Sequence, residues 1–237
     1  MWSVSLLKKI KLKNPILIEG LPGVGNVAKI TVDYLANHFK AKPLAYFASH
    51  SLQSAVFVRE DNTVSVPTIA MYYARQKRGP SLLFLVGDVQ PFDEASAVSF
   101  CHQVIGLCKS LGVKEVVTLG GLGTKTPAKK PQVYCTGTEK ATIEKYAKKG
   151  VSRDLYGVVG PIVGVSGILL GLAKRQNIPS AILLVETNVG LASDVDGAKQ
   201  LLGMLTHALR MKIPIQDLNE EPAMQIGLNQ DAANYIG

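Results

Sequence analysis

The chain has 237 residues and a mass of 25.4 kDa, which is enough for one large α/β domain or two small ones. Hydrophobic residues make up 47% of the sequence and charged residues 19%, and there is no long polar tract. This composition predicts a packed globular core and excludes a largely disordered chain. The formal net charge of +8 favours anionic partners.

The positive charge is spread along the chain. Its one local concentration, TKTPAKKP at residues 124–131, has no interleaved aromatic side chain that could stack on a base. A solvated basic loop fits this segment better than a nucleic-acid site. We therefore do not expect nucleic acid as a partner.

No segment has the length and composition of an exported or membrane-spanning one. The start of the chain, MWSVSLLKKIKLKNP, lacks the ~7 to 15 continuous apolar residues of a signal peptide. The most apolar stretch, residues 158–173, falls short of the ~20 residues that span a bilayer and contains proline and glycine. Cys101, Cys108 and Cys135 form no C-x-x-C pair, so we expect buried thiols in a reducing cytoplasm.

Short β-type runs alternate with helical periodicities along the chain. This alternation predicts an α/β fold with a mostly parallel central sheet flanked by helices, and an antiparallel addition around residues 55–88. We expect a single domain over residues 1–215, followed by a polar C-terminal helix and tail over 216–237. The predicted strands are 15–20, 43–48, 55–60, 65–73, 81–88, 115–121, 132–137, 158–160 and 181–187, and the predicted helices are 26–39, 93–111, 139–149, 165–176 and 198–211.

The segment EGLPGVGNVAKIT lies between a predicted strand and a predicted helix, and it contains four turn-forming residues, Gly20, Pro22, Gly23 and Gly25. A P-loop is excluded because Asn and Val stand where its Lys and Ser or Thr are required. A dinucleotide fingerprint matches in its glycines but lacks the acidic residue about 20 positions further on. We favour a structural corner and keep a weak anion site at Gly23, Gly25 and Asn26 as the alternative.

Two further patterns bear on catalysis. GVSGI, with Ser166 at its centre, resembles a nucleophile elbow but breaks G-x-S-x-G at the last position, so we favour a small residue in close packing. Asp88 and Glu186 follow buried strands, at the carboxyl ends where α/β proteins bind ligands, and Asp194 and Asp196 precede a helix. We favour turn, anchor and cap roles for them, and we predict no catalytic residue, metal or cofactor.

Five segments in order resemble the PAC2 family, the proteasome assembly chaperone family, in its archaeal form. They are GLPGVGNVA at 20–28, GDVQP at 87–91, VVTLGG at 116–121, GPIVGVSGILLGLA at 160–173 and SDVDGAKQLL at 193–202. The resemblance spans residues 14–215. The motif residues that we expect to shape the fold are Gly20, Pro22, Gly23, Gly25, Gly87, Asp88, Gln90, Gly120, Gly121, Gly164, Ser166, Gly167 and Asp194.

The resemblance implies a nucleoside-phosphorylase-related fold and a cytoplasmic, self-associating, ATP-independent chaperone for proteasome α and β subunits. Several members of the family dock on the proteasome α ring through a hydrophobic-Tyr-X tail, in which tyrosine is the penultimate residue. Tyr235 here is third from last, so we expect only a tail contact through Tyr235 or Ile236. The alternative is a nucleosidase-like hydrolase or a nucleotide- or anion-binding protein that uses the Gly20–Gly25 turn and the strand-end acids.

Overall fold

The computed structural model describes residues 2–218, apart from 51, 53–54, 60, 92, 125–129, 148–149 and 158. Its centre is a nine-stranded sheet with the order β1-β3-β6-β7-β2-β8-β11-β9-β10, and β4 and β5 form a separate two-stranded hairpin. The strands are β1 Ser3–Leu6, β2 Ile16–Gly20, β3 Lys42–Ala48, β4 Phe57–Val58, β5 Val64–Ser65, β6 Ile69–Ala74, β7 Leu82–Gly87, β8 Glu115–Thr124, β9 Val133–Gly137, β10 Val151–Ser152 and β11 Ser180–Asn188.

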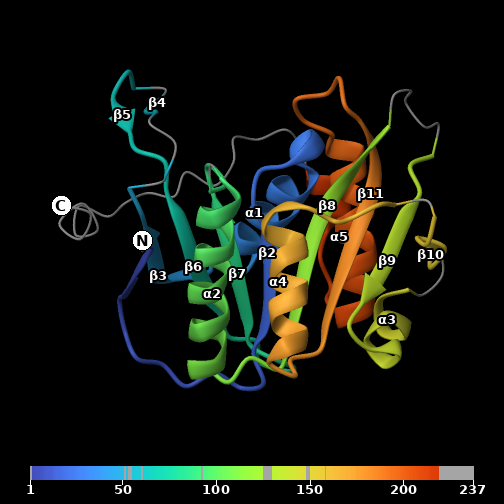
Figure 1. Cartoon of the computed structure of the whole chain (residues 1–237), viewed down its shortest axis with the longest axis horizontal. Helices are drawn as coiled ribbons and strands as arrows, with labels where there is room; N and C mark the ends of the chain where they lie inside the picture. Colours follow the sequence, from blue (N-terminus) through green and yellow to red (C-terminus); the bar gives the residue numbers. More distant parts are fainter. Residues whose placement is uncertain are drawn as a thin grey trace.

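The four central strands, β7, β2, β8 and β11, are parallel to one another. Every residue of β2 and β7 is buried, because helices cover both faces of the sheet. This explains why these strands are continuous apolar runs in the sequence. Their carboxyl ends all lie at one edge of the sheet, which is the upper edge in Figure 1.

The sheet as a whole is mixed, which corrects the prediction of a mostly parallel sheet. The antiparallel addition expected around residues 55–88 is present, since β6 runs antiparallel to both β7 and β3. Antiparallel pairing also extends to β1, which pairs with β3, and to β9, which pairs with β11. The sequence did not predict β1, because a run of four residues, two of them exposed, is too short to give a clear pattern.

Helices form a layer on each face of the sheet. In Figure 1, α2 and α4 lie in front of the sheet, and α1 and α5 lie behind it. Asp93 caps α2 by accepting a hydrogen bond from the Ser96 N–H group at 2.8 Å. The helices are α1 Val27–His38, α2 Glu94–Ser110, α3 Lys140–Tyr146, α4 Gly164–Arg175 and α5 Val195–Leu209, with the 3-10 turns η1 Val24–Asn26 and η2 Ile215–Asp217.

Each helical layer encloses its own hydrophobic core. Alternate residues of β2 separate the two cores, since Ile18 packs under α1 and α5 whereas Leu17 packs under α2 and α4. Cys101 and Cys108 lie in the second core, and all three cysteines of the chain are buried thiols without a disulfide, as predicted. The sheet therefore lies between two apolar cores. Polar side chains that could bind a ligand or react are to be sought at the ends of the strands.

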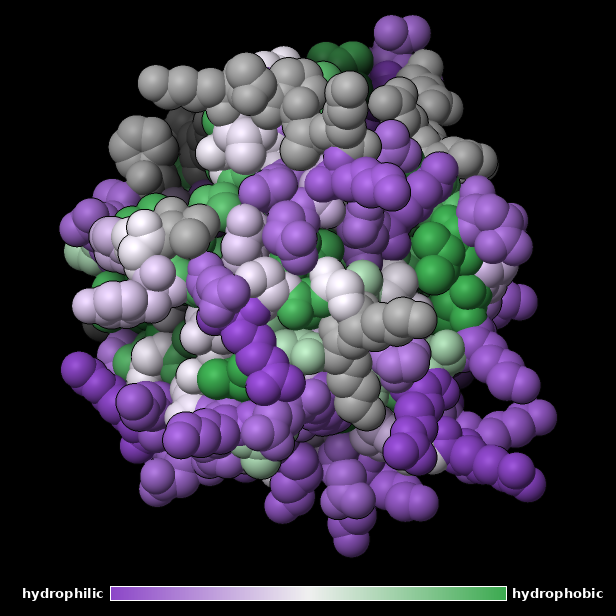
Figure 2. Space-filling model, turned by 90° about the vertical axis from the view of Figure 1, so that its right-hand side faces the viewer, coloured by the Kyte–Doolittle hydropathy of each residue, from purple (hydrophilic) through white to green (hydrophobic). Residues whose placement is uncertain are grey.

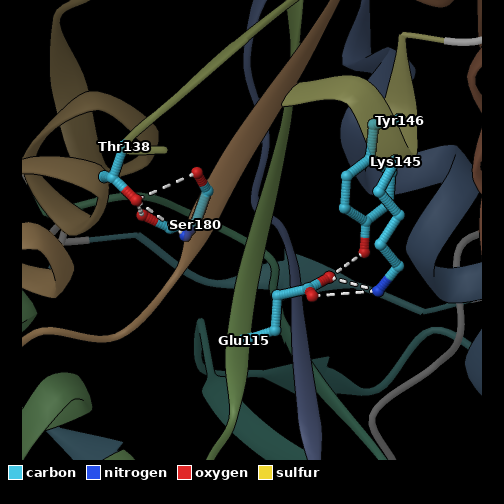
Figure 3. Close-up of polar contacts among 5 residues, drawn as sticks. All are labelled: Glu115, Thr138, Lys145, Tyr146 and Ser180. Carbon is cyan, nitrogen blue, oxygen red and sulfur yellow. Dashed lines mark hydrogen bonds and ion pairs between the residues drawn. The ribbon is translucent and has the colours of Figure 1, made fainter. Parts of the chain in front are cut away.

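At the amino ends of the central strands, α3 is attached to β8 through Glu115. Figure 3 shows the Glu115 carboxylate accepting hydrogen bonds from the Lys145 ammonium group, at 2.7 Å and 2.9 Å, and from the Tyr146 hydroxyl. Nearby, the Ser180 N–H group donates to the Thr138 hydroxyl at 3.0 Å and ties β11 to the end of β9. These contacts fix the lower edge of the sheet.

The molecular surface is largely hydrophilic on the side that carries β9, β10 and α3. Figure 2 shows mainly polar side chains there, with only scattered hydrophobic ones. By contrast, the β4–β5 hairpin exposes apolar side chains, including Phe57 at 43% and Val58 at 72%. Among the residues that the structure describes, no helix is long and apolar enough to cross a membrane.

Candidate functional site

The motif residues, far apart in sequence, gather at the carboxyl edge of the central strands. Gly20 ends β2 and is followed by the turn, Gly87 ends β7, and Gly120 and Gly121 lie in β8. Gly164 begins α4, and Asp194 caps α5. The structure thus brings together five segments that the sequence presented as separate motifs.

The turn between β2 and α1 is packed against its neighbours. A Cβ atom on Gly20 would collide with the Ala28 carbonyl oxygen and the Val32 side chain, and one on Gly121 would collide with the Val24 carbonyl oxygen. Gly25 has φ +62°, a backbone conformation that favours glycine. These positions leave no space for side chains.

Contacts with the start of α5 fix the same turn. Asp194 accepts hydrogen bonds from the Gly197 N–H group, at 2.8 Å, and from the Thr187 hydroxyl, and its own N–H group donates to the Gly25 carbonyl at 2.8 Å. The Asn26 amide donates to the Ala192 carbonyl at 3.0 Å. The Asp194 carboxylate therefore lies beside the turn that contains Gly23, Gly25 and Asn26, where an anion site was kept as the alternative. The anion site stays a prediction, and these contacts do not support it.

A pocket of about 320 Å³ opens at this edge, between the sheet and the start of α4. Its walls are mainly apolar, and its polar side chains are Gln90 and Ser166. Gln90 donates a hydrogen bond to the Pro22 carbonyl and so closes one side. The other lining residues are Leu21, Gly23, Val24, Ala28, Leu119, Gly120, Gly121, Leu122, Val159, Pro161, Ile162, Val163, Gly164, Ile182 and Leu184.

Behind Ser166 lies a buried carboxyl group, Glu19, whose importance the sequence analysis missed. The Ser166 hydroxyl donates to Glu19 Oε2 at 2.8 Å, and the Leu21 N–H group donates to Glu19 Oε1 at 3.0 Å. The Leu119 carbonyl is a second, longer neighbour of the Ser166 hydroxyl at 3.3 Å. The available signal was an acidic residue inside the buried run ILIEG, where a charge is costly.

Burial controls the protonation of Glu19, whose exposed fraction is 1%. Desolvation raises the pKa of Glu19 from 4.5 to about 7, against the opposing effect of the hydrogen bonds from Leu21 and Ser166. The carboxyl group therefore changes charge near neutral pH. A carboxylic acid with this property is suited to accept and return a proton.

The strand-end acids have structural partners. Asp88 accepts a hydrogen bond from the Thr68 N–H group at 3.0 Å, and burial raises its pKa. Glu186 accepts one from the Tyr134 hydroxyl and one from the Gln132 N–H group, both at 3.0 Å. Within the described part of the chain, no cluster of three His, Cys, Asp or Glu side chains could hold a metal ion.

A mixed sheet between two helical layers, with a glycine-lined pocket at the carboxyl ends of its parallel strands, defines a three-layer α/β protein. The sequence profile of the PAC2 family matches residues 17–225. The chain belongs to the PAC2 family. The relation to nucleoside phosphorylases remains a prediction.

Three relatives illustrate the similarity. The fold matches the crystal structure of Pyrococcus furiosus PbaB, described as an archaeal proteasome activator, with a TM-score of 0.84, 27% identity and 92% of each chain covered. Pyrococcus furiosus PbaA, described as an archaeal homolog of proteasome-assembly chaperone, matches with a TM-score of 0.74 and 22% identity over 91% of this chain and 85% of that chain. The uncharacterized protein MJ1210 of Methanocaldococcus jannaschii is 26% identical over 93% of this chain and 85% of its own length.

Tyr235 and Ile236, which the resemblance suggested as contacts to a partner, lie outside the described residues. Of the polar segment expected over residues 216–237, only residues 216–218 are described, and they belong to η2 and the residue after it.

Proposed function

We propose that this protein self-associates and binds subunits of the proteasome core particle as an assembly chaperone that does not hydrolyse ATP. The observation that carries the proteasome as partner is the match to PbaB, which is described as an archaeal proteasome activator and aligns with 92% of each chain covered. Membership of the PAC2 family supports the same partner. The net charge of +8 suits an acidic protein surface.

A second candidate function follows from the same match. PbaB is described as an activator rather than as an assembly factor. A factor of that kind acts on the finished core particle, whereas a chaperone acts on its separate subunits. The two functions therefore differ in the form of the proteasome that is bound.

One experiment tests the binding and separates the two functions. The full chain is mixed either with separate α and β subunits or with mature core particles, without ATP, and the complexes are weighed by native mass spectrometry. A chaperone gives homo-oligomers that carry free subunits and increases the yield of core particles. An activator binds the mature particle and increases its peptide hydrolysis, and the absence of any complex in both mixtures would contradict the proposal.

The same assay tests the tail contact. We expect Tyr235→Ala to weaken binding, since burying a tyrosine side chain at an interface contributes strongly to affinity. Asn229→Ala, a change in the same segment, is the matched control and should bind like the unchanged chain. Equal binding by both variants would remove Tyr235 from the interface and leave the folded body as the binding surface.

A further inference from the structure

The Glu19–Ser166 pair is a chemical feature that the proposed function does not call upon. Ser166 lines the pocket and is partly accessible, whereas Glu19 lies directly behind it and is buried. The distance of 2.8 Å between Ser166 Oγ and Glu19 Oε2 is within hydrogen-bond reach. An accessible hydroxyl held by a buried carboxylate is the arrangement of a nucleophile and its general base.

From this geometry we propose that Ser166 and Glu19 form a nucleophile and base pair that hydrolyses esters of small apolar carboxylic acids bound in the pocket. The acyl group fits the walls formed by Leu122, Ile182 and Leu184. A volume of about 320 Å³ limits the substrate to a small molecule. No lysine or arginine lines the pocket, so it offers no cation to a phosphate group.

The reaction has two balanced steps. First, Ser166 Oγ forms a bond to the ester carbonyl carbon while its proton passes to Glu19. The bond between the carbonyl carbon and the alcohol oxygen then breaks, and the alcohol leaves with the proton that Glu19 returns. Second, water attacks the acyl-serine, Glu19 accepts a proton from the water, and that proton returns to Ser166 Oγ as the acid leaves. No oxidant, reductant or metal is needed.

The first turn of α4 supplies the remaining requirement, which is a donor for the carbonyl oxygen. Val163 stands at the N-cap position, and no side chain caps the helix. The N–H groups of this turn begin beside the pocket, where Val163, Gly164 and Ser166 line it. Uncapped N–H groups stabilise the negative charge that develops on a carbonyl oxygen during acyl transfer.

A second polar group lies beside Glu19. Thr118 of β8 is paired in register with Glu19 of β2, so both side chains lie on the same face of the sheet. The Thr118 hydroxyl is buried, and no hydrogen-bond partner is found for it among the described residues. An unsatisfied buried hydroxyl is costly and is a recognised feature of functional sites.

The electrostatic surroundings allow Glu19 to act as a base near neutral pH. From α2, the group that interacts with Glu19 is the Cys101 thiol, whose pKa is raised above its usual range by burial and then by the Glu19 charge. The Cys101 thiol donates to the Val165 carbonyl at 3.7 Å, so it stays neutral and does not compete as a nucleophile. The base is therefore Glu19.

The test uses the purified full chain with a fluorophosphonate probe and with p-nitrophenyl butyrate. We expect one covalent adduct, located on Ser166 by peptide mass spectrometry, and ester hydrolysis that increases as the pH rises from about 6 to 8. Ser166→Ala should abolish both, and Glu19→Gln should reduce hydrolysis by roughly 100-fold or more. Ser99→Ala, which removes a partly buried serine of α2, is the matched control and should leave both unchanged.

Three outcomes would overturn the proposal. They are the absence of an adduct and of hydrolysis in the unchanged chain, equal labelling of Ser166→Ala, and a Glu19→Gln variant that is folded and fully active. Circular dichroism of each variant separates loss of chemistry from loss of folding, and Ser166→Cys provides a second nucleophile if Ser166→Ala fails to fold. A purely structural pair would alter only the melting temperature.

Discussion

Glu19 shows how one buried residue can make the stability of the whole fold depend on pH. Its pKa is raised from 4.5 to about 7 on folding, so the folded state holds the proton more tightly than the unfolded state between these values. The free energy of unfolding therefore falls as pH rises through this window. Asp33 lowers the free energy of unfolding further as pH rises from 3.8 to about 6. Burial raises the pKa of Asp33 to about 6, although the positive charge of Lys29 acts in the opposite direction.

We expect Glu19→Gln to remove the part of the decrease in unfolding free energy that occurs as pH rises from 4.5 to about 7. The amide has no charge to desolvate, so the variant should be more stable than the unchanged chain at pH 8, by an amount on the order of 3 kcal/mol. At pH 4.5 the two should be nearly equal. Urea unfolding at a series of pH values between 4 and 8 measures the difference.

Asp33→Asn is the comparison for this experiment. This substitution should flatten the plot of unfolding free energy against pH only below about pH 6, because the pKa of Asp33 is raised to about 6. An unchanged slope between pH 6 and 7 in Glu19→Gln would show that Glu19 is not the group that titrates there.

At the scale of secondary-structure elements, the position of η1 depends on the glycines of β8. A Cβ atom on Gly121 would collide with the backbone of Val24 and with the Thr187 side chain. We expect Gly121→Ala to destabilise the protein by about 1 to 3 kcal/mol, because η1 must move away from the strand. Chemical denaturation measures this loss.

Gly171 provides the matched control on α4. Nothing lies within 4 Å of a Cβ atom placed there, so Gly171→Ala should stabilise the protein by up to about 1 kcal/mol through helix propensity. Equal effects of the two substitutions would contradict the close packing of η1 on β8.

The sequence predicted these elements better than their arrangement. Periodicity identified all five helices, and continuous apolar runs identified the buried strands, because both are local patterns. The order of the strands depends on partners far along the chain, which explains why the antiparallel pairs of β1 with β3 and of β9 with β11 were missed. The contact between Glu19 and Ser166 joins residues 147 positions apart, and no local pattern indicates it.

At the scale of the whole molecule, the net charge of +8 acts on association rather than on folding. If the partner is an acidic protein surface, the association rate constant should fall several-fold between roughly 50 and 300 mM salt, as charges become screened over shorter distances. Surface plasmon resonance on immobilised core particles measures this rate. A rate that does not change with salt would assign the contact to apolar surface instead.

The topology of the sheet has a consequence for synthesis on the ribosome. Strand β2 is made early, yet both of its partners, β7 and β8, come much later, and β11 follows only after α4. Because the nascent chain emerges from its amino end, the buried run of β2 has no partner in the sheet until β7, at residues 82–87 of 237, has been made, and its second partner β8 is complete only at residue 124. The centre of the sheet is therefore completed last, and a chain cut short before β11 leaves the edge of β8 open to pairing with other chains.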